Sequence, residues 1–397
     1  MKPVIIIPAY SRPQALTRLL NSINCADYPS NDTRVIISLD GDASESVRKT
    51  ATNFSFDHGT VEINEQETHL GLRKHIIWCG DQTEIYDSVI VLEDDLFVDR
   101  YFYHFATHSL QFYQNEEKIS GISLYSYAYN PVSKLAFQPM YNGFLGFFMQ
   151  VPSSCGQAWT ANQWKRFKTW YDGASADKLE KNQGLPKIIK NWPESSWKKY
   201  FYAYMVELNL YFFYPYLSYS TNFSDHGGVH AKTATNFHHV ALGAFKRPED
   251  QFRFCRFKES TVYYDAFLEP LAPELFDEIG YSPNEIEIDF YGTKPISLLR
   301  RKKYVLTSKK CKNAMKIFRL GPRPIEKSVL NTVSGKSVPE FGYSDHIYLA
   351  KSNNIISEKR PFFEQVNYHS HFQMNNKYFF RRYMLYLITN LIGTDKQ

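Results

Sequence analysis

The sequence has 397 residues and a formal net charge of +5, with 22% charged residues. This length suffices for one large domain or two ordinary ones with a substantial core. A net charge this small gives no reason to expect a nucleic-acid partner. The five cysteines are odd in number and lack paired or metal-type spacing, which favours a reducing compartment over a disulfide scaffold. The apolar run at residues 4–7 is too short for a signal peptide or a membrane span, so we expect a cytoplasmic protein.

The first third of the chain alternates between apolar runs and helical periodicity. Strands are predicted over residues 4–7, 34–40, 60–65 and 88–92. Helices are predicted around residues 15–23, 44–53, 71–82 and 99–114, with Asp99 as the cap of the last. Such alternation predicts an α/β fold with a doubly wound, mostly parallel sheet and helices on both faces. No glycine-rich phosphate loop follows the first strand, so dinucleotide and P-loop folds are disfavoured.

One apolar run ends in three consecutive acids. The stretch SVIVLEDDLF at residues 88–97 predicts a strand buried on both faces that runs into Glu93, Asp94 and Asp95. In open α/β sheets ligands bind at the carboxyl ends of strands, and adjacent carboxylates repel unless a positive charge lies among them. Hard oxygen ligands suit Mg²⁺ or Mn²⁺ completed by substrate phosphates. The alternative is a solvated acidic turn.

Three segments together resemble a known family. VIIIPAYSRP at residues 4–13, SLDGD at 38–42 and VLEDD at 91–95 resemble the GT-A fold glycosyltransferases. The longer stretch LEDDLFVDRYF at 92–102 is similar to the N-acetylglucosaminyltransferase I type and its bacterial relatives. The likeness continues through SCGQAW at 154–159, WPESSW at 192–197 and residues 214–230, and so covers roughly residues 3–240.

The resemblance implies a nucleoside diphosphate sugar as donor and Mn²⁺ or Mg²⁺ at the site. Asp95 matches the metal ligand of the family, and the positions that match donor-binding residues are Pro8, Tyr10, Arg12, Asp40, His75, Glu93, Asp94 and His230. In this assignment Glu93 and Asp94 orient the nucleoside sugar, and Asp40 faces the nucleobase. For Arg12 the alternative is an ordinary loop cation, and for His75 a solvated helix residue.

The catalytic base is the point at which this sequence departs from the family. An inverting transfer needs a base for the acceptor hydroxyl, and the family places an Asp two residues after the second Trp of the Trp-Pro segment. Here that position is Lys199. Glu194 and Asp225 are the candidate catalytic residues that remain, although Glu194 also suits a routine helix start. Glu207 falls in a tyrosine-rich segment predicted to be helical over residues 200–213, and we expect it to be structural.

The composition changes beyond residue 240. We expect residues 1–240 to form the catalytic domain, with a nucleotide-sugar half at 1–115 and an acceptor half at 116–240, followed by an α-rich or mixed extension at 241–397. Residues 300–327 hold eleven Lys or Arg against one acid, Glu326, which indicates either a solvated basic helix or a surface for anionic lipid or nucleic acid. Residues 378–392 are apolar with a basic edge, so this stretch either packs on the domain or lies in a membrane interface.

These features predict a metal-dependent glycosyltransferase of the inverting class. It would move a hexosyl or N-acetylhexosaminyl group to a glycan or lipid-linked glycan in surface polysaccharide or glycoconjugate biosynthesis. We expect a cytoplasmic protein, with peripheral attachment at the inner face of the cell membrane as a further hypothesis. The alternative is a non-catalytic carbohydrate- or membrane-binding protein that keeps the GT-A fold. A nucleotidyltransferase is disfavoured because residues 9–13 lack a glycine- and basic-rich loop.

Overall fold

The computed structural model describes residues 1–223, 225, 238–243, 252–319, 324–330, 346–357 and 384. The chain divides into two compact units, which we describe separately. The first comprises Met1–Tyr127 and Pro139–Ala272, and the second comprises Ala128–Gln138 and Pro273–Gln397. The domain boundary expected at residue 240 stays a prediction. In the described parts of the chain, no helix has the length and apolar character needed to cross a lipid bilayer.

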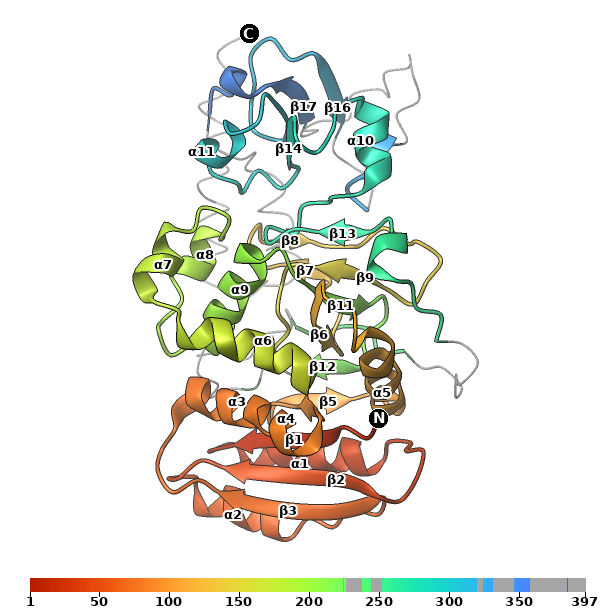
Figure 1. Cartoon of the computed structure of the whole chain (residues 1–397), viewed down its shortest axis with the longest axis vertical. Helices are drawn as coiled ribbons and strands as arrows, with labels where there is room; N and C mark the ends of the chain where they lie inside the picture. Colours follow the sequence, from red (N-terminus) through yellow and green to blue (C-terminus); the bar gives the residue numbers. More distant parts are fainter. Residues whose placement is uncertain are drawn as a thin grey trace. The chain divides into compact units, whose positions relative to one another are not determined.

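The first unit is built on a nine-stranded sheet with the order β13-β9-β11-β6-β10-β4-β1-β2-β3 (Figure 1). Its strands are β1 (Val4–Ala9), β2 (Thr33–Leu39), β3 (Gly59–Glu65), β4 (Ser88–Val91), β6 (Ile119–Ser123), β9 (Gly146–Met149), β10 (Gln157–Thr160), β11 (Tyr211–Pro215) and β13 (Tyr263–Tyr264). A separate antiparallel pair joins β5 (Leu96–Val98) to β12 (Ser220–Asn222). The helices are α1 (Pro13–Asn24), α2 (Glu45–Thr52), α3 (Gly71–Asp81), α4 (Thr83–Tyr86), α5 (Phe102–Tyr113), α6 (Ala161–Asp172), α7 (Ala176–Lys181), α8 (Lys187–Lys190) and α9 (Trp197–Glu207), with a 3₁₀ turn at Phe257–Glu259.

The predicted α/β alternation of the first third is confirmed. Strands β4, β1, β2 and β3 run parallel, and β1 and β4 are buried along their whole length. The sheet is nevertheless mixed, because β10 lies between β4 and β6 and is antiparallel to both. The acid-bearing strand β4 therefore has one parallel and one antiparallel neighbour. Five of the eight strand pairings in the sheet are parallel, so the description as mostly parallel holds.

Helices cover both faces of this sheet, as β11 illustrates. Successive residues of a strand point to opposite faces. Phe212 lies 5.4 Å, between ring centroids, from Phe201 of α9, whereas Phe213 lies 4.7 Å from Tyr113 of α5. The aromatic residues that the sequence supplies in such number therefore fill two layers of core, one under α9 and one under α5.

The helix predicted over residues 200–213 is wrong in its second half. Helix α9 ends at Glu207, and Tyr211–Pro215 form the fully buried strand β11. The break falls at Asn209, which has a φ of 51°. Asparagine tolerates this left-handed conformation better than most residues and so reverses the chain between helix and strand.

The second unit contains a four-stranded sheet with the order β14-β15-β17-β16. Its elements are β7 (Tyr129–Asn130), β8 (Leu135–Ala136), α10 (Pro273–Ile279), β14 (Ile286–Asp289), α11 (Ile296–Leu299), β15 (Tyr304–Thr307), β16 (Lys316–Arg319), α12 (Lys327–Leu330), β17 (His346–Lys351) and a 3₁₀ turn at Ser352–Asn354. The mixed composition expected for the extension is present. A single basic helix is not, because β15 and β16 lie within the basic stretch and bury Val305, Leu306 and Phe318.

Candidate active site

The site is built where three parallel strands end side by side. Strand β1 pairs with β2 as far as Ala9 and Leu39, and it pairs with β4 as far as Ile6 and Val91. Parallel strands end at the same edge of a sheet, so the loops that follow them meet there. These loops carry most of the residues predicted to bind the donor.

Arg12 lies among the acids that follow β4. Its Nη1 donates a hydrogen bond to Asp95 Oδ2 at 2.9 Å, and its Nε donates to Asp94 Oδ2 at 3.4 Å. Its Nη2 pairs with Asp94 Oδ1 as well. One guanidinium therefore bridges two of the three consecutive carboxylates, which supplies the positive charge that the sequence requires at this place.

Burial governs the charge of the acid cluster. It raises the pKa of Glu93 above the ordinary value, and the neighbouring Asp95 raises it further while Arg12 opposes the rise. For Asp94, burial raises the pKa to about 6 although the ion pair with Arg12 lowers it. Burial works against the charge of Arg12, yet Asp94 and Asp95 outweigh it and raise its pKa. The site thus concentrates negative charge that further positive charge would stabilise.

Asp95 fits the role of a metal ligand. Its Oδ1 is buried and accepts no hydrogen bond from the described residues, whereas its Oδ2 accepts Arg12. A buried carboxylate oxygen without a donor is costly unless a ligand satisfies it. Mg²⁺ and Mn²⁺ prefer such oxygens and bind through one or two carboxylates together with substrate phosphates.

Asp40 organises the start of helix α3. Its buried carboxylate accepts the backbone N–H groups of Gly41 at 2.9 Å, Leu70 at 2.6 Å and Gly71 at 3.1 Å. The N-terminal amides of a helix carry partial positive charge, so this arrangement stabilises both the carboxylate and the helix. The sequence predicted contact with the base for Asp40, and that role stays a prediction beside the capping role.

A second acidic group surrounds Asp40 at the surface. Asp40, Asp42 and His69 each offer a ligand atom within 4.8 Å of the others, and His69 Nδ1 lies 2.7 Å from Asp42 Oδ1. The Asp40 oxygens already accept backbone N–H groups, so they are poorly available to an ion. Tyr10 joins this group through a hydrogen bond from its hydroxyl to Asp42 at 3.3 Å and a ring contact with His69 at 5.3 Å.

The remaining predicted donor contacts lie at different depths. Pro8 is buried in β1 opposite Ser38 of β2. His75 is also buried, and its Nε2 lies 2.8 Å from Ser38 Oγ. Burial lowers the pKa of His75 to about 4, so the ring is neutral at pH 7. His75 is thus a packed residue of α3 instead of the solvated one considered as its alternative, and a direct contact with the nucleotide stays a prediction. His230 lies outside the described residues.

Both candidate bases form ion pairs. Glu194 accepts a hydrogen bond from Lys199 Nζ at 3.3 Å and another from the Tyr200 hydroxyl. The hydrogen bond from Tyr200 is the main cause of a lowered pKa for Glu194, with Lys199 contributing. Asp225 pairs with Arg18 of α1, whose Nη2 also donates to the backbone carbonyl of Asp95 at 3.4 Å. A carboxylate that is already paired is a weaker proton acceptor, and neither residue is assigned as the base.

Two polar residues beside the acids were not singled out from the sequence. Lys198 Nζ donates to the Tyr127 hydroxyl at 3.0 Å and to Ser154 Oγ at 3.2 Å. Burial opposes its charge, but Tyr127, Cys155 and Glu93 together raise its pKa. The position of Lys198 directly after Trp197 was the available signal.

Gln157 is the second such residue. It is the first residue of β10 and pairs with Val91, which lies two residues before Glu93 in the sequence. Its amide is fully buried, and neither polar atom has a hydrogen-bond partner in the described parts of the chain. Such an amide next to the acid cluster is typical of a position that a bound group completes.

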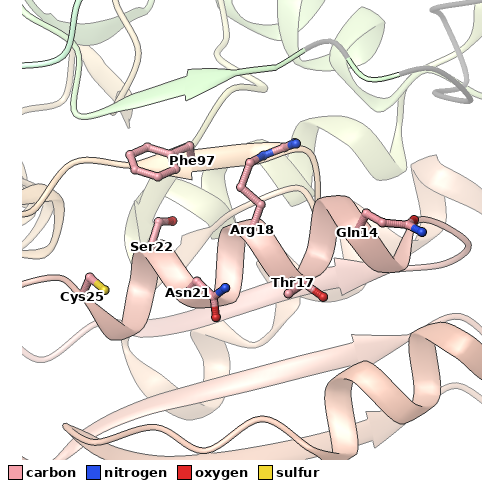
Figure 2. A pocket seen from close by; sticks show the side chains of 7 residues that line it. All are labelled: Gln14, Thr17, Arg18, Asn21, Ser22, Cys25 and Phe97. Carbon is pink, nitrogen blue, oxygen red and sulfur yellow. The ribbon is translucent and has the colours of Figure 1, made fainter.

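A shallow groove of about 400 Å³ runs along α1 and does not contain the acids. It is lined by Gln14, Thr17, Arg18, Asn21, Ser22, Cys25 and Phe97, and Figure 2 shows Arg18 extending from α1 toward β5, the strand that carries Phe97. The cation of the groove is Arg18, which pairs with Asp225 and lies 4.1 Å from the centre of the Phe223 ring. The groove therefore lies beside the loop that carries Glu93–Asp95, because Arg18 also donates a hydrogen bond to the Asp95 carbonyl.

The chain matches no protein-family model and no curated protein sequence. Among solved structures it is similar to TarS residues 1–349 from S. aureus, with 14% identity and a TM-score of 0.37 over 55% of this chain and 60% of that one. The same protein in complex with UDP-GlcNAc gives a TM-score of 0.37 at 14% identity, over 60% of this chain and 63% of that one. The mannosyltransferase PcManGT from Pyrobaculum calidifontis, in complex with GDP-Man and Mn²⁺, gives 0.32 at 11% identity over 52% and 70%. The chain spans less than two thirds of TarS 1–349, and scores this low define neither a family nor an activity.

Proposed function

We propose that this protein is a glycosyltransferase that uses a nucleoside diphosphate sugar. The observation that carries the proposal is the meeting of Arg12, Asp40 and the Glu93–Asp95 acids at the carboxyl ends of adjacent parallel strands. This is where an α/β sheet binds a nucleotide. The resemblance of the three sequence segments to GT-A glycosyltransferases supports the same assignment.

In this proposal Asp95 holds a divalent cation, Mn²⁺ or Mg²⁺. When bound, the cation would neutralise the charge that develops on the diphosphate leaving group. Arg12 is the nearest protein cation to the same place and orients Asp94 and Asp95 through its hydrogen bonds. Glu93 and Lys198 lie on the side of α9. The Asp40 and Tyr10 side chains flank the position proposed for the nucleobase of the donor.

The acceptor that we propose is a glycan or a lipid-linked glycan, and the transferred group is a hexosyl or N-acetylhexosaminyl sugar. The reaction would invert the anomeric centre and serve the biosynthesis of surface polysaccharide or a glycoconjugate. We further propose that the protein works in the cytoplasm, at the inner face of the cell membrane. The acceptor, the sugar and the inversion rest on the family resemblance, and the location rests on the cysteine usage and on the basic residues 300–327.

A second candidate function is supported by the ion pairs of Glu194 and Asp225. With Lys199 at the family's base position and both other acids paired, the site could bind a nucleotide sugar without transferring it. Such a protein would be a carbohydrate-binding relative of the enzymes.

The test is a screen of uridine and guanosine diphosphate sugars against the full-length protein, with Mn²⁺ or with a chelator. We expect one donor to raise the unfolding temperature and to be slowly hydrolysed in the presence of Mn²⁺, because binding to the folded state stabilises it. Stabilisation without hydrolysis or transfer would favour the non-catalytic candidate. The absence of any stabilising nucleotide sugar would contradict both.

A further inference from the structure

An exposed aromatic ring lies in the loop that leads into β9, in the first unit. Tyr141 is 72% exposed, more than any other large apolar or aromatic residue in the parts of the chain that the structure describes. Its ring contacts the ring of Tyr216, the residue that follows β11, at 5.2 Å between centroids and an angle of 64°. Tyr216 in turn lies 5.2 Å from the buried Phe147 of β9. The exposed ring is therefore the outer end of a row of packed rings.

Neighbouring hydrogen bonds hold this loop. The hydroxyl of Tyr216 donates to the carbonyl of Met140 at 2.6 Å. On the other side, Asn142 Oδ1 accepts the backbone N–H of Phe144 at 3.1 Å. The residues before and after Tyr141 are therefore fixed. A ring on a fixed framework loses little conformational freedom when it binds, so more of its contact energy appears as affinity.

The strand pairings place this loop at the same edge of the sheet as the acids. Strands β4, β6 and β11 run in one direction, because β10 is antiparallel to both β4 and β6 and β11 is parallel to β6. The pairings also put Val91 of β4 level with Tyr214 of β11. Glu93 and Tyr216 each follow two residues later, and the N–H of Tyr216 donates to the carbonyl of Leu145, before β9, at 3.1 Å. The loop therefore lies at the edge where Glu93–Asp95 leave the sheet.

The width of the sheet sets the distance between the two places. The order β9-β11-β6-β10-β4 puts three strand spacings between β4 and β11 and four between β4 and β9 (Figure 1). At the usual spacing, β11 lies about 14 Å and β9 about 19 Å from β4. A sugar that contacts Tyr141 is thus too far from the acids to receive the transferred group itself. It would have to belong to the same acceptor as the sugar that does.

We propose that Tyr141 and Tyr216 bind a sugar of the acceptor away from the sugar that is extended, so that the acceptor is an oligosaccharide or polysaccharide chain. A tyrosine ring packs its apolar face on the C–H face of a pyranose, and its hydroxyl can hydrogen-bond the sugar hydroxyls. Residues 139–146 and 214–219 contain no charged side chain, which suits a neutral sugar better than an ionic partner. This inference rests on the proposed transfer reaction and names its acceptor more closely.

The experiment applies the full-length protein to a printed array of neutral glucose, galactose and N-acetylglucosamine oligosaccharides, from single sugars to hexasaccharides. We expect retention to increase with chain length. The oligosaccharide that is retained best is then titrated in solution against wild type and variants. Tyr141→Ala should bind it about tenfold more weakly, as expected for an aromatic anchor. Tyr141→Phe should keep most of the affinity, because it keeps the ring that stacks.

The matched control is Ile85→Ala, which removes a side chain that is 69% exposed in α4, before the amino end of β4, and should bind like the wild type. Equal affinity of wild type and Tyr141→Ala would overturn the proposal. So would equal losses in Tyr141→Phe and Tyr141→Ala, or retention of no oligosaccharide by the wild type. Thermal stabilisation by nucleotide sugars, measured on the same samples, tests the proposed function separately. Stabilisation together with any of these three outcomes would overturn the acceptor contact alone.

Discussion

Asp95 is the single residue on which the proposed chemistry depends most. Its buried Oδ1 has no donor in the described chain, and Arg12 neutralises its other oxygen. We expect Asp95→Asn to lower transfer by about three orders of magnitude, because an amide cannot supply the anionic ligand. The fold should be kept, since the side chain changes little in volume.

Steady-state kinetics with Mn²⁺ and circular dichroism would measure both effects. Glu45→Gln, an exposed acid in α2, is the matched control and should leave transfer unchanged. Wild-type activity in Asp95→Asn, together with activity that survives a chelator, would contradict the metal-dependent hypothesis.

Lys198 is the second residue whose surroundings make a definite prediction. It is half-buried, and its ammonium interacts electrostatically with the Glu93 carboxyl. In a double-mutant cycle, Lys198→Met should cost more free energy of unfolding beside Glu93 than beside Glu93→Gln, by about 1 kcal/mol. Urea denaturation of the four proteins at pH 8 would measure the coupling. A coupling energy of zero would show that Lys198 acts only through Tyr127 and Ser154.

At the scale of one element, helix α3 depends on Asp40. Asp40→Ala removes the acceptor of two backbone N–H groups at the start of this helix, those of Leu70 and Gly71, and of the Gly41 N–H in the loop after β2. We expect a loss of about 2 kcal/mol in the free energy of unfolding, at the upper end for a lost cap. The KM for the donor should rise more than kcat falls, because the nucleobase that Asp40 is proposed to contact is remote from the bond that breaks.

Asp40→Asn separates the two roles, because it keeps one acceptor oxygen. We expect it to retain part of the stability that Asp40→Ala loses. Donor kinetics and urea unfolding of both variants would test this. An unchanged KM in both would leave Asp40 with the capping role alone.

Elements of the first third were predictable because their signals are local. The apolar run of β4 predicts a strand directly. The helical spacing of apolar residues in α1 predicts a helix in the same way, at Ala15, Leu16, Leu19 and Ile23. The placing of β10 between β4 and β6 had no local signal, because it depends on long-range pairing. The end of α9 was missed because aromatic and apolar residues lie on both sides of the turn, at 200–206 and 210–214, and Asn209 alone marks it.

The same distinction holds for the site. Glu93, Asp94 and Asp95 are adjacent in sequence, so their proximity needed no structure. Lys198 and Gln157 come near the acids only through the packing of α9 and β10, and the one signal in the sequence was the position of Lys198 after Trp197.

Across the whole molecule, two groups with shifted pKa values give opposite dependences of stability on pH. The pKa of His75 is depressed from 6.5 to about 4 in the folded state. Its contribution is therefore present above pH 6.5 and is lost as the pH falls toward 4, by about 3 kcal/mol at most. We expect urea unfolding of the wild type to weaken over this range and His75→Gln to weaken less. Parallel curves for the two proteins would contradict the buried neutral ring.

Glu93 acts in the other direction. Its folded pKa lies above the ordinary value of 4.5, so its contribution is present below pH 4.5 and is lost as the pH rises above that value. In chelator, Glu93→Gln should flatten this alkaline decline and exceed the wild type in stability at pH 8. A variant less stable than the wild type at pH 8 would show that the charged carboxylate is well solvated.

The guanidinium of Arg12, which spans Asp94 and Asp95, has a consequence for the order of events at the site. It is a counter-ion attached to the same chain, so a dissolved cation that approaches Asp95 competes with a partner of high effective concentration. A diphosphate would relieve the competition, because it offers Arg12 another anion. We therefore expect donor and divalent ion to bind interdependently, each tightening the other by the same factor. The protein would then bind Mn²⁺ tightly only when the nucleotide sugar is bound, and it would hold free Mn²⁺ only weakly between turnovers.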